Sequence, residues 1–197
     1  MPAAAHPAKA LLALSLLALA WPAHAQQRID IAVISDGPDD RLPEYRQMYV
    51  DELLALTQNE FDVRLRDFTG AWTEDSIEAA YAAAYADDAV DMVLTTGFIA
   101  AQLGTQRKAY PKPTFLPLIL DPRLLSRPPV DGKSGIPNLS YLIVYSNIGE
   151  DLDSLTELID VDRVALLVDA ELSGAIPQLL ESSTALSRQR GIELDAI

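Results

Sequence analysis

The sequence predicts a doubly wound parallel α/β sheet followed by the beginning of a second α/β lobe. Strands and helices alternate from residue 29 onward, and the strand at 29–35 is a nearly continuous apolar run rich in β-branched residues, as expected of a strand covered on both faces. The alternation starts again near residue 151 but yields only two strands and two helices by residue 197, too few for a lobe with its own core. We therefore expect a first lobe at 26–146 and an incomplete second lobe at 147–197, as in a truncated or split chain.

Residues 1–25 precede this pattern and have the features of a secretory signal peptide. The apolar run at 11–20 is about half as long as a membrane span, and Ala23, His24 and Ala25 form the small-x-small pattern of a cleavage site. Because no cysteine follows the run, a lipid anchor is excluded. The mature chain is therefore expected to be free in the periplasm.

The composition excludes several kinds of site. The chain has no Cys, and its two histidines, His6 and His24, lie in the leader, which removes thiolate chemistry, histidine-dependent triads and histidine-ligated zinc from the mature chain. The formal net charge of −14 argues against a nucleic-acid partner. The Gly-Lys-Ser at 132–134 and the acidic cluster at 36–40 lack the spacing of phosphate-binding and calcium-binding loops. We expect neither an enzyme nor a cofactor.

The individual elements follow from periodicity and from turn residues. In order, the patterns predict a strand at 29–35, a helix at 42–57, a strand at 61–68, a helix at 74–86, a strand at 91–96, a helix at 97–108, strands at 114–120 and 138–145, a helix at 151–159, a strand at 161–169, a helix at about 175–190 and a strand from 191. Alternating charges place the strand at 61–68 at a sheet edge. Pro117 removes a backbone donor and is expected to confine its strand to an edge or a bulge.

Candidate ligand-binding residues follow from the expected sheet, because ligands of open α/β sheets bind outside the carboxyl ends of the strands. This rule selects Ser35 and Asp36 after the first strand, Thr96, Gly97 and Phe98 after the third, Asp121 after the fourth and Tyr145 after the fifth. Gly97 is expected to let the backbone approach a ligand closely. The alternative for each residue alone is ordinary turn and cap chemistry. Among the aromatic residues, Trp72 is assigned to core packing.

Three stretches resemble a known family. They are DMVLTTGFIAAQLGTQRKAYPKPTFLPLILDP at 91–122, LLSRPPVDGKSGIPNLSYLIVY at 124–145, and RVALLVDAELSGAIPQLLESSTALSRQRGIELDAI at 163–197. The first is similar to the family's strand, Gly-containing turn, Ala-rich helix and Pro-led strand, and the second to its Pro-Asn crossover between lobes. The chain thus resembles the substrate-binding proteins of ABC transporters, in the branch with the type I periplasmic-binding-protein fold and a flavodoxin-like first lobe.

The resemblance implies two lobes that close on a small solute, an amino acid among the candidates, and deliver it to a membrane permease. It adds Asp169 and Ser173 as cleft residues from the second lobe. A solute carboxylate is expected to bind amide donors at the helix starts near Gly97 and Ser173. The alternative is an extracytoplasmic sensory domain with the same fold, in which the bound solute signals to a membrane kinase.

Overall fold

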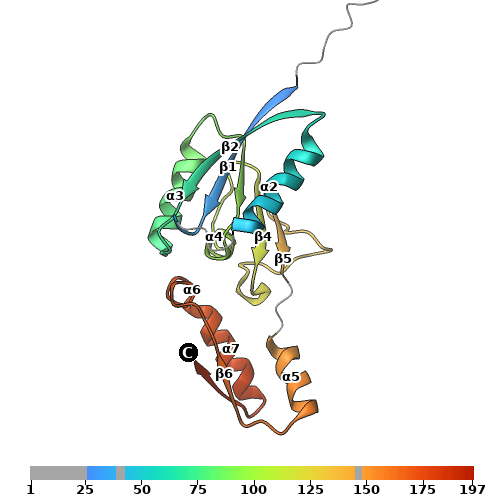
Figure 1. Ribbon diagram of the computed structural model, residues 1–197, viewed down its shortest axis with the longest axis vertical. Coiled ribbons are helices and arrows are strands. Elements are labelled where there is room, and N and C mark those ends of the chain that lie inside the picture. Colours follow the sequence, from blue (N-terminus) through green and yellow to red (C-terminus); the bar gives the residue numbers. More distant parts are fainter. Residues whose placement is uncertain (1–25, 39–42, 145–147) are drawn as a thin grey trace, which may run out of the picture.

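The computed structural model describes residues 26–38, 43–144 and 148–197, which we divide into an N-terminal unit (26–144) and a C-terminal unit (148–197). The N-terminal unit contains β1 (Gln27–Ser35), α2 (Pro43–Thr57), β2 (Phe61–Thr69), α3 (Glu74–Ala86), β3 (Met92–Thr95), α4 (Phe98–Gly104), β4 (Thr114–Ile119), a 3₁₀ turn (Pro122–Leu124) and β5 (Leu139–Ile143). The C-terminal unit contains α5 (Ile148–Leu158), β6 (Arg163–Leu166), α6 (Ala170–Ala175), α7 (Pro177–Gln189) and β7 (Glu193–Ala196). The two units lie one above the other in Figure 1.

The N-terminal unit is built on a five-stranded parallel sheet of order β2-β1-β3-β4-β5. The chain first moves outward from β1 to β2 and then returns past β1 to β3, so the direction of winding reverses between β1 and β3. Helices α2 and α3 accordingly lie on opposite sides of β1 and β2 (Figure 1). The predicted doubly wound α/β fold is confirmed, and so is the edge position of β2.

The strand that contains Pro117 differs from its prediction in one respect. β4 lies between β3 and β5, so the edge position was wrong, but its pairing with β5 shifts register between Leu116 and Ile119. Pro117 falls within this irregularity, where a missing backbone donor breaks no regular ladder. The sheet therefore accommodates the proline through the bulge, which was the other predicted solution.

The core of the N-terminal unit lies mainly between the sheet and α3. Ala32 and Ile34 of β1 are fully buried against Ile77 of α3 and Ile99 of α4. Tyr81 on α3 is also fully buried, and its hydroxyl donates to the Ala100 carbonyl oxygen over 2.7 Å. Thus α3 and α4 are tied together on one face of the sheet.

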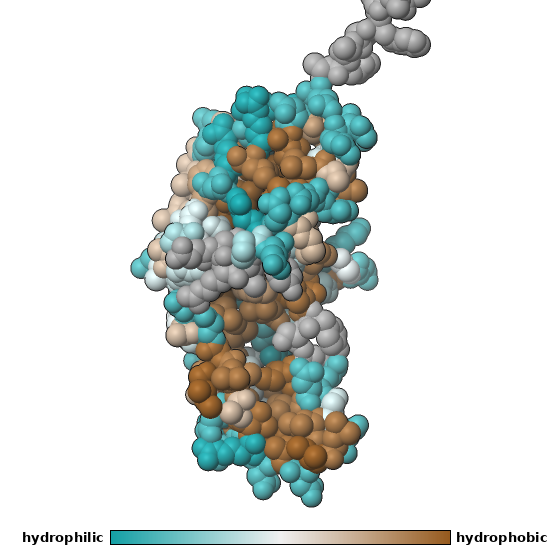
Figure 2. All heavy atoms as spheres, in the orientation of Figure 1, coloured by the Kyte–Doolittle hydropathy of each residue, from teal (hydrophilic) through white to brown (hydrophobic). Residues whose placement is uncertain are grey.

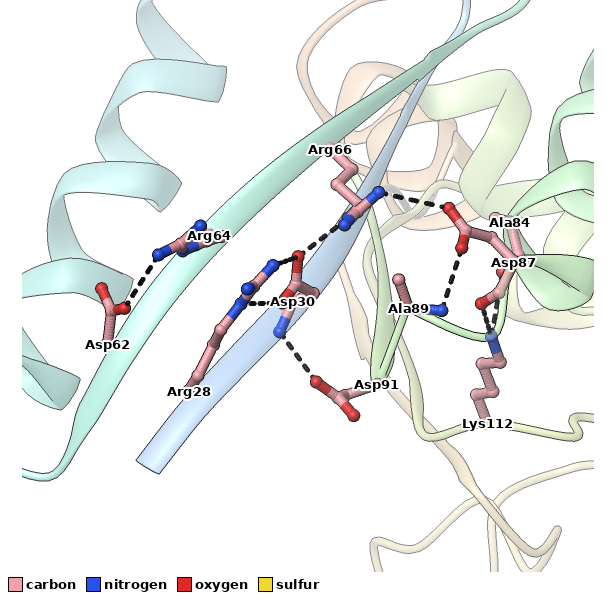
Figure 3. A network of polar contacts seen from close by, with 10 residues as sticks. All are labelled: Arg28, Asp30, Asp62, Arg64, Arg66, Ala84, Asp87, Ala89, Asp91 and Lys112. Atoms are coloured by element: carbon pink, nitrogen blue, oxygen red, sulfur yellow. Dashed lines mark hydrogen bonds and ion pairs between the residues drawn. The ribbon is translucent and has the colours of Figure 1, made fainter. Parts of the chain in front are cut away.

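A network of ion pairs occupies the amino-terminal end of β1 (Figure 3). The Asp30 carboxylate accepts hydrogen bonds from Arg28 Nε at 2.6 Å and from Arg66 Nε at 2.8 Å, although its side chain is only 6% exposed. Arg66 also contacts Asp87, whose backbone oxygen accepts from Lys112 Nζ over 2.5 Å. The Arg28 and Arg66 hydrogen bonds lower the pKa of Asp30 to about 2.

The C-terminal unit has a two-stranded parallel sheet, β6 beside β7, with α7 packed on it and α5 packed on α7. The predicted helix at about 175–190 forms as α7, with Pro177 in its first turn, and α6 is an additional short helix before it. Apolar side chains gather on the lower part of the molecule, which holds this unit (Figure 2). Within the described ranges, no helix is both long and apolar enough to cross a membrane.

Candidate functional site

The structure contains a pocket at the point where the winding of the sheet reverses. The carboxyl ends of β1 and β3 form one side, and α6, which contacts α4, faces this edge (Figure 1). The cavity has a volume of about 300 Å³. It is lined by Ser35, Asp36, Gly37, Trp72, Thr96, Gly97, Phe98, Ile99, Asp169 and Leu172. The walls therefore come from both units and are mostly apolar.

Six of the residues selected from the sequence meet at this pocket. Ser35 and Asp36 follow β1, and Thr96, Gly97 and Phe98 follow β3. The sixth, Asp169, comes from the C-terminal unit, where it precedes α6. The shared position arises because the two strands are neighbours in a parallel sheet, so the loops that follow them leave from the same edge.

Asp36 caps the start of α4 from the neighbouring strand. Its carboxylate accepts hydrogen bonds from the backbone N–H groups of Ile99 at 3.0 Å and Ala100 at 2.7 Å, and the residue is 7% exposed. Gly97 is required because a Cβ there would lie 2.0 Å from Asp36 Oδ1. The glycine expected to admit a ligand thus makes room for Asp36.

Asp169 plays a similar role at the start of α6. Its Oδ1 accepts hydrogen bonds from the backbone N–H groups of Glu171 at 3.1 Å and Leu172 at 3.2 Å. The Ser173 N–H bonds to the Asp169 carbonyl oxygen over 2.9 Å. The chain's own groups thus already occupy these donors, while the expectation that a solute carboxylate binds amides at the two helix starts stays a prediction.

Trp72 is one of the pocket residues that the sequence analysis did not select. Its backbone adopts φ of 61°, a left-handed conformation that is strained in a residue other than glycine. The conformation is held by the Trp72 N–H, which donates to the Asp36 carbonyl oxygen over 2.8 Å. The indole packs so closely on Gly37 that a Cβ there would lie 2.0 Å from Trp72 Nε1. The strand-end rule would have found Trp72 had it also been applied after the second strand.

Three selected residues do not line the pocket. Asp121 is 3% exposed and binds the Arg123 backbone N–H at 2.9 Å and Arg123 Nε at 2.8 Å. Burial raises its pKa, but hydrogen bonds from Arg123 and from Ser182 on α7 outweigh burial and hold the pKa below its ordinary value. Ser173 lines a separate surface hollow and donates to the Ala170 carbonyl oxygen over 3.1 Å. Tyr145 lies outside the described residues.

Two threonines at the end of β3 have enclosed hydroxyl groups. Thr95 is 0% exposed and Thr96 is 3% exposed, and neither Oγ1 atom has a hydrogen-bond partner in the described part of the structure. Only Thr96 belongs to the pocket wall. Among the described residues, no group of acidic side chains is arranged to hold a metal ion.

No protein-family model and no curated protein matches the chain. Solved structures do. A periplasmic binding protein type 1 from Bordetella pertussis aligns with a TM-score of 0.57 and 13% identity over 88% of this chain and 49% of its own. An ABC domain in complex with L-Trp from Streptococcus pneumoniae aligns with a TM-score of 0.52 and 17% identity over 88% of this chain and 57% of its own. A conserved domain protein from Vibrio cholerae aligns with a TM-score of 0.55 and 16% identity over 86% of this chain and 56% of its own.

The fold is that of type I periplasmic binding proteins. The predicted resemblance is thereby confirmed at the level of the fold. This chain spans about half the length of the solved structures that it matches, from 49% to 57%.

Proposed function

We propose that the chain is the periplasmic solute-binding component of an ABC transporter, which binds a small solute between two lobes and delivers it to a membrane permease. In this proposal residues 1–25 are a signal peptide, 26–146 form the first lobe and 147–197 begin the second. The observation that carries it is the pocket at the winding reversal, whose walls include Asp169 and Leu172 of the C-terminal unit. Ligands of open α/β sheets bind at this position.

A solute in this pocket would contact both units and so favour their closed arrangement. It stabilises that arrangement only by the difference between its affinities for the closed and open forms. A shift from 1% to 99% closed requires about 5.5 kcal/mol of such difference. The wall contributed by Asp169 and Leu172 is the part of the pocket that an open form would lose.

The hydrogen bonds of the pocket support binding rather than catalysis. Asp36 and Asp169 are the acidic residues of the described lining, and both hold backbone N–H groups of a helix start. A general acid or base must exchange its proton with the substrate. Carboxylates fixed on amides are instead suited to shaping the site.

Thermal unfolding of the mature protein with a panel of small solutes tests the proposal. The panel contains amino acids, small carboxylates, sugars and uncharged aromatic compounds. A solute that binds the folded state raises its stability by RT ln(1 + [L]/Kd), about 2.7 kcal/mol at a hundred times Kd. A saturable rise in melting temperature with one class supports the proposal, and no rise with any class contradicts it.

A pair of variants tests whether the C-terminal unit takes part. Leu172→Ala removes apolar contact from the pocket wall and is expected to weaken binding about fivefold, because about 1 kcal/mol of apolar contact is lost. Leu167→Ala is the control, since Leu167 is 82% exposed and does not line the pocket. Equal affinities in the two variants would contradict a solute site shared by both units.

A further inference from the structure

We infer that a buried anchor outside the pocket holds the two units together, so that the closed arrangement is the resting state of the protein and a solute enters only when the C-terminal unit moves away. The closed arrangement is the one in which α6 contacts α4 and both units contribute to the pocket wall. The inference rests on the proposed function for the role of the pocket and adds how access to it is controlled. It depends on contacts that a solute does not make.

The anchor is the corner between α6 and α7, formed by Ala175 and Ile176. These residues are 6% and 0% exposed, and within the described ranges the other buried members of their apolar cluster all belong to the N-terminal unit. Ile176 directly follows the short helix that contains Leu172 and precedes Pro177 at the start of α7. Neither Ala175 nor Ile176 lines the pocket. The burial of the corner therefore does not depend on contact with a solute.

A polar contact also joins the two units, between the carboxyl end of β4 and α7. Asp121 is 3% exposed and pairs with Arg123 Nε at 2.8 Å, and its carboxylate also accepts a hydrogen bond from Ser182 on α7. Asp121 and Ser182 lie outside the pocket lining. Moving the C-terminal unit away would remove one donor from a buried carboxylate, which is unfavourable.

Separating the units has a cost that a solute does not offset. Separation would expose the Ile176 side chain to water and leave a cavity in the cluster that contains Ile99 and Ala100 of α4. This cost is the same for an empty and for an occupied pocket, because the corner lies outside the lining. A solute thus binds to an arrangement that the chain itself already favours.

The anchor accordingly controls how fast a solute reaches the pocket. When the open form is a minor population, entry is slowed in proportion to its fraction. Weakening the anchor then speeds entry and release alike and changes Kd little, because the closed forms with and without solute lose the same contact. If the open form were the resting state, weakening the anchor would instead leave entry unchanged and weaken binding.

The distance between two nitroxide labels tests the inference in the solute-free protein. The chain has no Cys, so introduced cysteines carry the labels: Asp75→Cys in the first turn of α3 and Ala170→Cys at the start of α6, both at exposed positions. Pulsed electron resonance should give a distribution dominated by the distance of the closed arrangement. A distribution dominated by longer distances would overturn the inference, because the open form would then be the resting state.

Two matched variants of the labelled protein identify the anchor. Ile176→Val should raise the open fraction about fivefold, because the closed arrangement loses the burial of one methylene group. Ile31→Val makes the same change in β1, where Ile31 is 2% exposed and lies outside the cluster of Ile176, so it should leave the distribution unchanged. An unchanged distribution in Ile176→Val, or an equal shift in Ile31→Val, would overturn the role of the corner.

Acrylamide quenching of Trp72 fluorescence gives a second measurement that needs no labels. A protein that starts at Gln26 has Trp72 as its one tryptophan, and Trp72 lines the pocket. The quenching constant should be larger in Ile176→Val than in the wild type and in Ile31→Val. Equal constants in all three proteins would contradict opening at the corner.

The outcomes separate this inference from the proposed function, because the labels report on the two units and the thermal panel reports on the solute. If a solute of the panel binds but the open form dominates the solute-free protein, the inference is wrong and the solute-binding function stands. If the units are closed but no compound of the panel binds, the anchor stands and the proposed function fails.

Discussion

The two units use the same alternation of strand and helix but bury it very differently. In the N-terminal unit the centre of β1, from Ile31 to Ile34, is at most 2% exposed. In the C-terminal unit no residue of β6 is buried, and Leu167, which follows it, is 82% exposed. A parallel strand is buried only when it has neighbours on both sides and helices on both faces. Part of the burial in the C-terminal unit comes instead from contact with the N-terminal unit, because Ala175 and Ile176 join an apolar cluster of that unit.

That contact is made by the junction between α6 and α7. Ala175 and Ile176 are 6% and 0% exposed, and both belong to the apolar cluster that also contains Ile99 and Ala100 of α4. The most deeply buried apolar side chain of the C-terminal unit thus lies in the core of the other unit. The same arrangement places Leu172 and Asp169 in the wall of the pocket.

The largest expected effect comes from removing side chains at equivalent positions in the two sheets. Ile34→Ala in β1 should lower the free energy of unfolding by about 2–5 kcal/mol, since it leaves a cavity in a closed core. Leu166→Ala in β6 should lower the free energy of unfolding by only about 1 kcal/mol, because its side chain is only partly buried in the folded state. Urea unfolding followed by Trp72 fluorescence, together with hydrogen exchange of the β6 amides, measures both.

Equal losses of unfolding free energy for Ile34→Ala and Leu166→Ala would contradict the difference in burial between the two sheets. They would mean that β6 is as well packed as β1 in solution. Ile143→Ala is a control inside the N-terminal unit, since Ile143 at the end of edge strand β5 is 38% exposed and should behave like Leu166.

The next effect concerns the junction itself. Ile176→Ala should destabilise the protein by about 2–4 kcal/mol, because the side chain is fully buried. It should also lower hydrogen-exchange protection at β6 and β7 more than at β1, since it loosens the anchor of the C-terminal unit. Ile159→Ala is the control, since Ile159 follows the end of α5 and is 56% exposed. Uniform loss of protection across both units would show that they unfold together.

The sequence predicts the elements better than it predicts which side chains line the pocket. Strand-end logic found Asp36 and Gly97 because loop position follows from strand order, which periodicity and parallel connections determine. It did not reveal that Asp36 caps α4, because the cap joins residues 63 and 64 positions apart. Asp121 was selected by the same rule, but it pairs with its neighbour Arg123 and does not line the pocket. Such pairings depend on side-chain geometry that no local pattern specifies.

The ion pairs of the two units also differ in burial, since Asp30 is 6% exposed and Asp195 is 40% exposed. The pH dependence of stability tests whether this difference matters. The pKa of Asp30 is lowered to about 2 from 3.8 by Arg28 and Arg66. Its stabilising contribution is therefore fully present above about pH 4 and is lost as the pH falls through about 2. We expect the difference in unfolding free energy between the wild type and Asp30→Asn to be constant at higher pH and to shrink over that interval.

Urea unfolding at a series of pH values measures this difference. The matched control is Asp195→Asn in the C-terminal unit, where the pair with Arg163 has side chains 40% and 64% exposed. Exposed pairs contribute little, so this variant should resemble the wild type near neutral pH. If the difference in unfolding free energy between the wild type and Asp30→Asn stays constant down to pH 2, the lowered pKa of Asp30 is contradicted.

The smallest expected effects distinguish a core residue at the end of β3, Thr95, from the pocket residue that follows it, Thr96. Thr95 points to the same face as Val93, into the cluster beneath α3, and its hydroxyl has no partner in the described part of the structure. Thr95→Val should therefore raise stability by about 1 kcal/mol, because an unpaired buried hydroxyl is replaced by a methyl group of similar size.

Thr96→Val should give a similar gain without solute, since the Thr96 hydroxyl is likewise enclosed and unpaired within the described residues. Thr96, however, lines the pocket, and rotation about χ1 exchanges its hydroxyl with its methyl group. A solute with a hydrogen-bonding group could then use the hydroxyl, so Thr96→Val should weaken binding by about 1 kcal/mol while Thr95→Val leaves affinity unchanged. Thermal unfolding and calorimetry on both variants decide the matter: equal affinities would leave Thr96 with a structural role only, whereas a loss confined to Thr96→Val makes it the residue that orients the solute.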